Sequence, residues 1–264
     1  MFLTLVTTVF ALPLAAQQRA AERDGWCDED RGWREERGYY CEVREMTVPA
    51  DRAVITVDAE PNGGIYVEGW DRNEIRLRAK VTARARTDDD AQAMVEDVEL
   101  ITDRSAIRAA GPRPARREGW SVSYELLVPR RSNVDLSTLN GGIEITGVSG
   151  RIEFRTTNGG VHLSRLGGDV RGQATNGGLH IELDGSQWEG EGMDVQTTNG
   201  GVRLEIPSGY SARLETGTVN GGLEIDFPIT VQGRINRRLT TELGNGGKTI
   251  RAVTTNGGVV IRRG

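Results

Sequence analysis

Aliphatic and polar residues alternate along most of the chain, and the alternation is organised around a repeated tripeptide. Asn-Gly-Gly occurs eight times, and the asparagines of these triplets are Asn62, Asn140, Asn158, Asn176, Asn199, Asn220, Asn245 and Asn256. In seven of the eight copies, aliphatic residues stand three and five positions after the asparagine. The residue between them is usually polar, and this period of two is typical of a half-buried β-strand. The pattern predicts a short strand after each of these seven turns. The copy at Asn245 breaks the pattern, and its spacing of 11 residues from Asn256 predicts an irregular terminal rung whose asparagine still belongs to the stacked column of turns.

Two all-β architectures fit a strand that follows a repeated turn. In a hairpin meander, Asn-Gly forms a tight turn between antiparallel strands. In a β-solenoid, the tripeptide is a corner, and equivalent residues stack about 4.8 Å apart in successive rungs. Asn140, Asn158 and Asn176 are spaced by 18 residues, and stacked asparagine amides can hydrogen-bond along a column. Because a meander does not need identical turns, we expect a β-solenoid with Asn-Gly-Gly corners, and the meander is the alternative.

The residue types of the repeat account for much of an unusual composition. The chain contains 35 glycines, of which 16 belong to the eight triplets. Asparagine and glycine both tolerate a positive φ, so we expect that conformation to let the chain turn sharply at each triplet. Threonine stands two positions before the asparagine in five copies: Thr138, Thr156, Thr197, Thr218 and Thr254.

One segment departs from the strand pattern and predicts a helix around residues 88–100. Its apolar residues recur on one helical face: Ala91, Met94, Val95 and Val98. Thr87 and Asp90 form a capping-box pattern, and the acidic residues 88–90 suit the N-terminal end of a helix. We expect this short helix to cover an open end of the sheet core, which repeat proteins must shield.

The N-terminal part of the chain predicts export. Residues 1–16, MFLTLVTTVFALPLAA, are apolar and uncharged and end in small residues, as a signal peptide does. Residues 17–45 form a cap that contains the two cysteines, Cys27 and Cys41, and in an exported chain we expect them to form a disulfide. Residues 46–264 form the repeat domain. We therefore expect a protein of the periplasm or cell surface that does not span the membrane once the signal peptide is removed.

Charge and motifs exclude several classes of function. Lysine and arginine number 33 against 38 acidic residues, which gives a net charge of −5. An acidic chain without a dense basic stripe argues against a nucleic-acid partner. The sequence contains no G-x-G-x-x-G, H-E-x-x-H or G-x-S-x-G motif. It therefore predicts no cofactor and no catalytic residue.

The two histidines of the chain suggest a metal site. His162 and His180 each stand four positions after their asparagine, one period of 18 residues apart. Stacking in sequence order predicts an outward column that reads Glu144, His162, His180, Arg203 and Glu224. Glu144, His162 and His180 would then lie within reach of one zinc ion. A second column, Glu182, Glu205 and Asp226, is a candidate for a hard cation such as calcium, and the alternative for both columns is a solvated polar ladder.

A tryptophan between two repeats is a candidate partner contact. Trp188 lies in the longer insert Asp184 to Gly192. An exposed tryptophan on a solenoid loop could stack on a sugar or anchor a partner. The alternative is that Trp188 packs back over its rung.

The T-x-N-G-G-Φ-x-Φ repeats (Φ, aliphatic), the cysteine-containing preface and the acidic-capped helix resemble the bacterial putative-adhesin, or toast-rack, family of β-strand-repeat proteins. The resemblance covers about residues 46–264. It implies an exported, non-enzymatic β-solenoid associated with the cell envelope, with a protein or surface partner. A glycan is a second candidate ligand, and a lectin-like polysaccharide binder would differ only in that ligand. A carbohydrate-active β-helix enzyme is the alternative, although 5% aromatic residues and the lack of a convincing site weigh against it.

Overall fold

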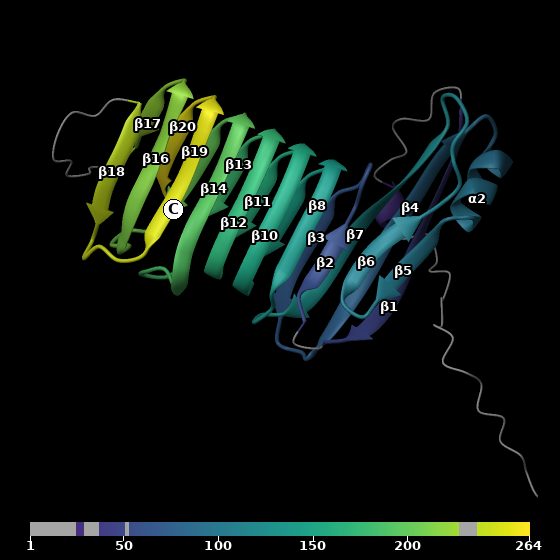
Figure 1. The fold of residues 1–264 in the computed structure, drawn as a ribbon, viewed down its shortest axis with the longest axis horizontal. Coiled ribbons are helices and arrows are strands. Elements are labelled where there is room, and N and C mark those ends of the chain that lie inside the picture. The colour runs from purple at the N-terminus through teal and green to yellow at the C-terminus, as the bar shows by residue number, and fades with distance from the viewer. Residues whose placement is uncertain (1–24, 29–36, 51–52, 227–236) are drawn as a thin grey trace, which may run out of the picture.

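The computed structural model describes residues 25–28, 37–50, 53–226 and 237–264, so the expected signal peptide, residues 1–16, lies outside the described residues. Two ten-stranded sheets lie against each other along the molecule (Figure 1). The described residues also form two helices, α1 (Gly25–Asp28) and α2 (Asp88–Glu96). Neither helix is long and apolar enough to cross a membrane.

The strands of each sheet are given in their spatial order. The first, sheet A, consists of β1 (Gly38–Pro49), β4 (Glu74–Ala85), β7 (Gly119–Pro129), β3 (Ile65–Trp70), β9 (Ile143–Thr146), β11 (Val161–Ser164), β13 (Leu179–Glu182), β15 (Val202–Ile206), β20 (Val259–Arg263) and β17 (Leu223–Ile225). The second, sheet B, consists of β18 (Arg238–Leu243), β16 (Ala212–Asn220), β19 (Thr249–Asn256), β14 (Gly190–Asn199), β12 (Gly167–Asn176), β10 (Ser149–Asn158), β8 (Val134–Asn140), β2 (Ile55–Asp58), β6 (Ala106–Ala110) and β5 (Glu99–Asp103).

The repeats are rungs of a β-solenoid, as the sequence predicts. Each rung has a strand in sheet B, an Asn-Gly-Gly corner and a strand in sheet A. Neighbouring rungs pair in parallel and in register, so that Val161 lies opposite Leu179 and Asn158 opposite Asn176. The hairpin-meander alternative is therefore wrong for the repeats. The rungs are, in spatial order, β2/β3, β8/β9, β10/β11, β12/β13, β14/β15, β19/β20 and β16/β17.

The last two rungs reverse the order of the sequence. After β17 the chain returns as β18, antiparallel to the outer side of β16, and then enters β19 on the inner side of β16. The rung β19/β20 thus lies between β14/β15 and β16/β17. Asn245 lies in the turn that joins β18 to β19, where its backbone N–H donates to Ser211 Oγ at 3.2 Å. The prediction that Asn245 belongs to the stacked asparagine column is therefore wrong.

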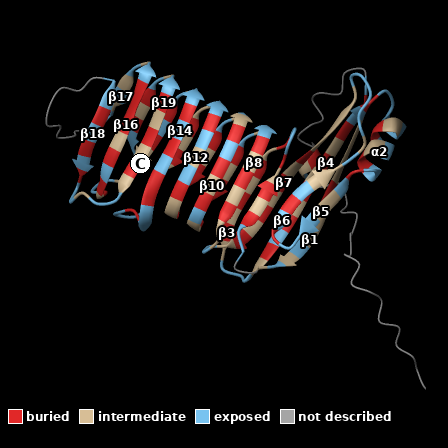
Figure 2. Cartoon of the chain, viewed as in Figure 1, coloured by how far each residue is buried: buried red, intermediate tan, exposed pale blue. Residues whose placement is uncertain are grey.

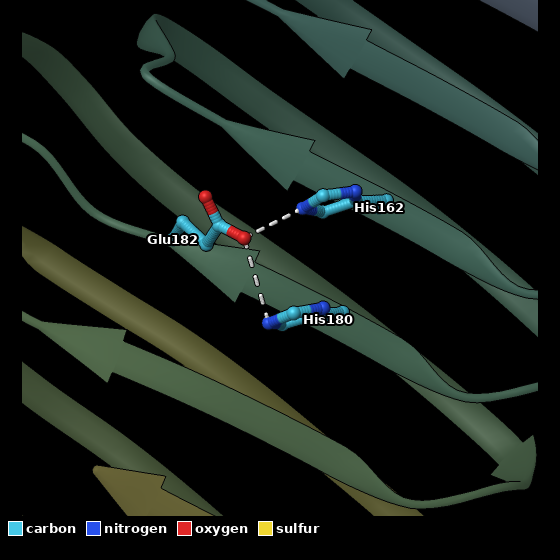
Figure 3. Close-up of side chains that lie close together, drawn as sticks. All are labelled: His162, His180 and Glu182. Carbon is cyan, nitrogen blue, oxygen red and sulfur yellow. Dashed lines mark hydrogen bonds and ion pairs between the residues drawn. The ribbon is translucent and has the colours of Figure 1, made fainter. Parts of the chain in front are cut away.

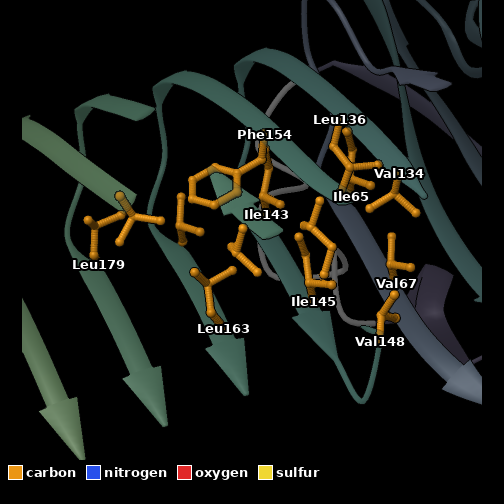
Figure 4. Close-up of a cluster of buried hydrophobic side chains, with 14 of the residues drawn as sticks. Ile65, Val67, Val134, Leu136, Ile143, Ile145, Val148, Phe154, Leu163 and Leu179 are labelled. Atoms are coloured by element: carbon orange, nitrogen blue, oxygen red, sulfur yellow. The ribbon is translucent and has the colours of Figure 1, made fainter. Parts of the chain in front are cut away.

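The two sheets bury one continuous aliphatic core. Along each rung, buried and more exposed residues alternate, which Figure 2 shows as banded strands. The residues three and five positions after the corner asparagine of each rung point into this core, as Ile143 and Ile145 do (Figure 4). The ring of Phe154 fills the space beside Gly172, whose missing side chain makes room for it. The period of two therefore predicts the buried face correctly.

Side chains at the corners connect each rung to the next. The asparagine Nδ2 groups donate to the Oδ1 atom of the neighbouring asparagine at 2.8–2.9 Å, in a ladder that runs through Asn62, Asn140, Asn158, Asn176, Asn199, Asn256 and Asn220. Buried threonine hydroxyls also hydrogen-bond to corner glycine carbonyls of the neighbouring rung. Thr156 Oγ1, for example, donates to the carbonyl of Gly141 at 2.9 Å.

The first glycine of each corner is required by this stacking and not by a left-handed backbone. A Cβ atom on Gly159 would collide with the carbonyl oxygen of Gly141 in the neighbouring rung, and the other first glycines are equally confined. Among the corner residues of the seven rungs, only Gly257 has a φ in the left-handed region, at 154°. The expectation of a positive φ at the corners is therefore wrong for nearly all of them. It holds for the turn after Asn245, where Gly246 and Gly247 have φ values of 73° and 140°.

Helix α2 packs at the end of the molecule where β1 and β4 lie (Figure 1). Thr87 Oγ1 caps it by accepting from the amide of Asp90 at 3.1 Å, and Ala91 and Val95 are buried. The guanidinium of Arg44 donates to the carbonyls of Val95 and Val98 just where the helix ends. The predicted end at residue 100 is too late, because Glu99 already pairs with Ala110 in sheet B.

The two cysteines form the expected disulfide, which joins α1 to β1. Because β1 pairs with β4 from Gly38 to Pro49, it runs through the predicted boundary between cap and repeat domain at residues 45 and 46. The boundary between these domains stays a prediction.

One buried polar group in this core has no partner. Tyr124 lies on β7 with 1% of its surface exposed, and its hydroxyl makes no hydrogen bond to any described residue. Burial raises the pKa of the Tyr124 hydroxyl well above its ordinary value of 10.0, and the charge of Asp58 raises this pKa further. The folded protein therefore holds this proton more tightly than the unfolded chain does.

The corner glycines predict a contrast between adjacent positions. We expect Gly159→Ala to lower the free energy of unfolding by about 1–3 kcal/mol, since its Cβ overpacks the stack. The matched control is Gly160→Ala, whose Cβ would lie 3.7 Å from the nearest atom and which should change the stability by less than about 0.5 kcal/mol. Chemical denaturation of both variants measures this, and equal losses would contradict the steric explanation.

The buried hydroxyl predicts the effect of Tyr124→Phe. At neutral pH the variant should be more stable by about 1 kcal/mol, because an unpaired buried hydroxyl is removed. The pKa of Tyr124 is higher in the folded protein than in the unfolded chain. As the pH rises above 10.0, the unfolded chain therefore loses this proton first, and the wild type should lose stability. Thermal unfolding from about pH 9 to about pH 11 should show a smaller loss for Tyr124→Phe. Tyr40→Phe, at a partly buried position on β1, is the control, and parallel pH curves for wild type and Tyr124→Phe would refute the interpretation.

Candidate functional site

A groove crosses the outer face of sheet A, from rung to rung. Its volume is about 770 Å³. Two columns of the repeat line it. One is the second corner glycine, Gly64, Gly142, Gly160, Gly178, Gly201 and Gly258; the other is the residue two positions later, Tyr66, Glu144, His162, His180, Arg203 and Val260. Both columns face outward, because successive side chains on a strand alternate between the two faces. The groove exists because the first of these two outward columns has no side chains.

The disulfide positions an aromatic ring in this groove. Trp26 lies in α1, next to Cys27, and contributes to the groove lining. Its ring packs under two cations of β4: Lys80 Nζ lies 5.3 Å and Arg78 Cζ 5.6 Å from the ring centroid. Lys80 also donates to the Trp26 carbonyl at 3.2 Å. Position 26 carries no repeat signal, so the sequence alone could not place this ring in the groove.

The two histidines stack on each other in the middle of the groove lining. His162 on β11 and His180 on β13 lie opposite each other in the parallel register. Their ring centroids are 4.7 Å apart, and the ring planes differ by 8°. Both side chains are a little more than one third exposed. The prediction that the 18-residue period brings the two histidines together is confirmed.

Carboxylates surround this histidine pair. Glu182 Oε1 lies 3.0 Å from His162 Nε2 and 3.7 Å from His180 Nε2 (Figure 3). Glu205 Oε1 lies 3.2 Å from His180 Nε2, and Glu144 Oε1 lies 3.8 Å from His162 Nδ1. The two hydrogen bonds, His162–Glu182 and His180–Glu205, each join a histidine to the glutamate two residues beyond its register partner on the next strand. Long side chains span this diagonal easily.

In the structure, Glu182 takes the place of Glu144 beside the two histidines of the predicted zinc site. The ligand atoms of His162, His180 and Glu182 all lie within 4.8 Å of one another, and no other trio of this kind occurs among the described residues. Glu144 approaches only the Nδ1 side of His162 and is not a member of that group. The sequence placed Glu182 in a separate column. The signal for its role was its position two residues after His180, on the same face of the strand.

The reversed rungs also correct both predicted columns. Val260 separates Arg203 from Glu224, because β20 lies between β15 and β17. For the same reason Glu205 lies opposite Arg262, and β17, with Asp226 after it, is one strand further away. The predicted calcium column of Glu182, Glu205 and Asp226 is therefore interrupted by an arginine.

Trp188 is not an exposed contact. Only 5% of its surface is exposed, and its indole nitrogen donates to the carbonyl of Gly168 at 3.0 Å. The ring packs back over the rung, which was the alternative to the predicted partner contact.

Three carboxylates lie near Tyr66 at the β3 part of the groove. Burial raises the pKa of Tyr66, and the neighbouring carboxylates of Glu68, Glu144 and Glu125 raise it further. Arg203, in the same column as the histidines, supplies a positive charge on β15. The groove thus offers acidic, basic, aromatic and imidazole groups along one line, above a floor of backbone.

Comparisons with known proteins give one family match. A family model described as Toastrack DUF4097 matches residues 45–262. Comparison with curated proteins gives no match.

Three solved structures match this chain at low identity and low TM-score. A putative cell adhesion protein from Clostridium sporogenes has 10% identity and a TM-score of 0.42, over 86% of this chain and 100% of the other. A putative adhesin from Bacteroides fragilis has 11% identity and a TM-score of 0.40, over 84% and 96%. A putative lipid binding protein from Parabacteroides distasonis has 9% identity and a TM-score of 0.33, over 84% and 96%. At these values only the family model supports an assignment.

Proposed function

The chain belongs to the Toastrack DUF4097 family, and from this premise we propose that it is an exported, non-enzymatic protein of the bacterial cell envelope that binds a partner along the groove of sheet A. Adhesion to a surface is the form of this function that the family resemblance implies. The partner is a protein segment or an envelope surface, and a glycan is a second candidate.

The observation that carries this proposal is the column of second corner glycines. The first glycine of each corner is explained by packing, because a Cβ there would collide with the neighbouring rung. The second glycine is less confined: a Cβ would lie 3.5–3.7 Å from the nearest atom at Gly64, Gly160 and Gly258 and 3.2–3.3 Å at Gly142, Gly178 and Gly201, against 1.9–2.2 Å at the first glycines. Packing therefore does not require glycine at the first three of these positions, and at the other three a neighbouring atom would have to shift by only a few tenths of an ångström. An open groove that continues from rung to rung does require a small residue at this position.

The shape of the groove favours an extended partner. Six rungs at about 4.8 Å spacing give a groove of about 24 Å between the first and last strand. Its floor is backbone, and its wall changes in charge from rung to rung. An extended chain laid across the strands could meet a different polar group at each step. Trp26 and Tyr66, which both line the groove, are the observation that favours a lectin-like role, since sugars stack on aromatic rings.

Export is supported by two independent features. Disulfides such as Cys27–Cys41 persist in oxidising compartments and are rare in the cytosol. Residues 1–16 have the pattern of a signal peptide. Together they favour the periplasm or the cell surface.

Filling the groove should abolish partner binding without unfolding the protein. We expect a photo-crosslinking side chain at position 203, in the groove, to capture a partner in native cells. The same side chain at position 173, which is exposed on sheet B, is the matched control. Introducing Gly160→Leu should reduce the amount of partner crosslinked at position 203 by about tenfold or more, since the new side chain occupies the groove.

Thermal unfolding of Gly160→Leu must match the wild type for this comparison to hold. Equal capture at positions 203 and 173, or capture that Gly160→Leu leaves unchanged, would overturn the proposed use of the groove.

The enzymatic alternative has a direct test. Incubation of the purified chain with a panel of envelope and plant polysaccharides should release no reducing ends. Release by the wild type, with loss of that activity in Glu144→Gln or Glu182→Gln, would replace the non-enzymatic proposal with a carbohydrate-active enzyme. Retention of a polysaccharide on the protein without cleavage would instead identify the glycan as the partner.

A further inference from the structure

We propose that His162, His180 and Glu182 bind a divalent transition-metal cation such as Zn²⁺ on the outer face of sheet A. The inference does not depend on the identity of the partner that the groove binds. It rests on the placement of three ligand atoms, on their charge environment and on the register that holds them.

The ligand atoms have the types and spacing that zinc requires. Imidazole nitrogen and carboxylate oxygen both bind Zn²⁺ at about 2.0–2.2 Å, in tetrahedral geometry. Ligand atoms of such a tetrahedron are about 3.3 Å apart. The distances from Glu182 Oε1 to His162 Nε2 and His180 Nε2, 3.0 and 3.7 Å, lie on either side of that value. With all three atoms within 4.8 Å, a modest tilt of the stacked rings brings both nitrogens to one ion.

The charges around the histidines favour a cation. Glu182 and Glu205 approach the Nε2 atoms of the pair from β13 and β15, whereas Arg203 is the basic residue next to His180 in the column. Glu182 and Glu205 stand directly opposite each other on neighbouring strands. Like charges in that position repel. A bound divalent ion would offset this repulsion while it uses one of the two carboxylates as a ligand.

The register fixes the site in place. Both histidines and Glu182 project from paired strands whose backbones are hydrogen-bonded in parallel. A site on regular strands is held more accurately than one on a loop. Because the three side chains are partly exposed, one coordination position remains open to solvent. Replacing these side chains also leaves the buried core untouched.

Titration calorimetry with zinc chloride tests the proposal. The full chain, purified without a polyhistidine tag and treated with chelator, should bind one equivalent at micromolar affinity. His162→Gln, His180→Gln and Glu182→Gln should each weaken binding by at least about tenfold. Glu144→Gln is the matched control, since that carboxylate lies on the far side of His162, and it should change the affinity by less than about twofold.

Two further readouts separate a built site from loose surface binding. Cobalt(II) should give the visible absorption of a tetrahedral ion in the wild type and lose it in Glu182→Gln. Zinc should raise the melting temperature of the wild type and not that of His180→Gln. Absence of binding at millimolar zinc, unchanged affinity in the three ligand variants, or an equal loss in Glu144→Gln would each overturn the assignment.

Discussion

The structure depends on the spacing between hydrogen-bonded rungs. Paired strands lie about 4.8 Å apart, and at a corner this brings the backbone of one rung directly onto the backbone of the next. Only a residue without a Cβ fits at the first position after the asparagine, because the carbonyl oxygen of the neighbouring rung occupies that space. The asparagine ladder and the threonine hydroxyls then bind the layer together. Glycine, usually a source of flexibility, is here a condition of tight packing.

The same register that builds the core creates the functional surface. In-register stacking places each repeat position in a column, whether it points inward or outward. Inward columns are aliphatic and form the core, whereas the outward column that contains His162 and His180 changes its residue type from rung to rung. The second corner glycine opens a groove, the residue two positions later lines it, and the two histidines meet there because their repeats are neighbours. The candidate binding groups therefore come from different residue types at one repeat position, while the backbone around that position stays the same from rung to rung.

The sequence predicted the features that follow from local periodicity. The alternation after each Asn-Gly-Gly identified the buried face, the spacing identified a solenoid, and Thr87 marked the start of α2. Inferences that required the order or environment of the rungs were less successful. Asn245 has the corner tripeptide but lies in the turn between β18 and β19. Trp188 is surrounded by glycine and polar residues in the sequence, yet it packs into the core.

By itself, then, the sequence determined the rung, since the strand period, the corner and the buried positions depend on residues close together in the chain. It also determined that His162 and His180 would be neighbours, because one repeat separates them. Only the tertiary structure decided that β19/β20 enters between two earlier rungs, which separates Glu205 from Asp226 by an arginine. It also decided that Glu182 reaches across to His162 and that the disulfide places Trp26 in the groove. These contacts depend on side-chain conformation and on the places where the chain departs from sequential stacking, and a local pattern carries no information about either.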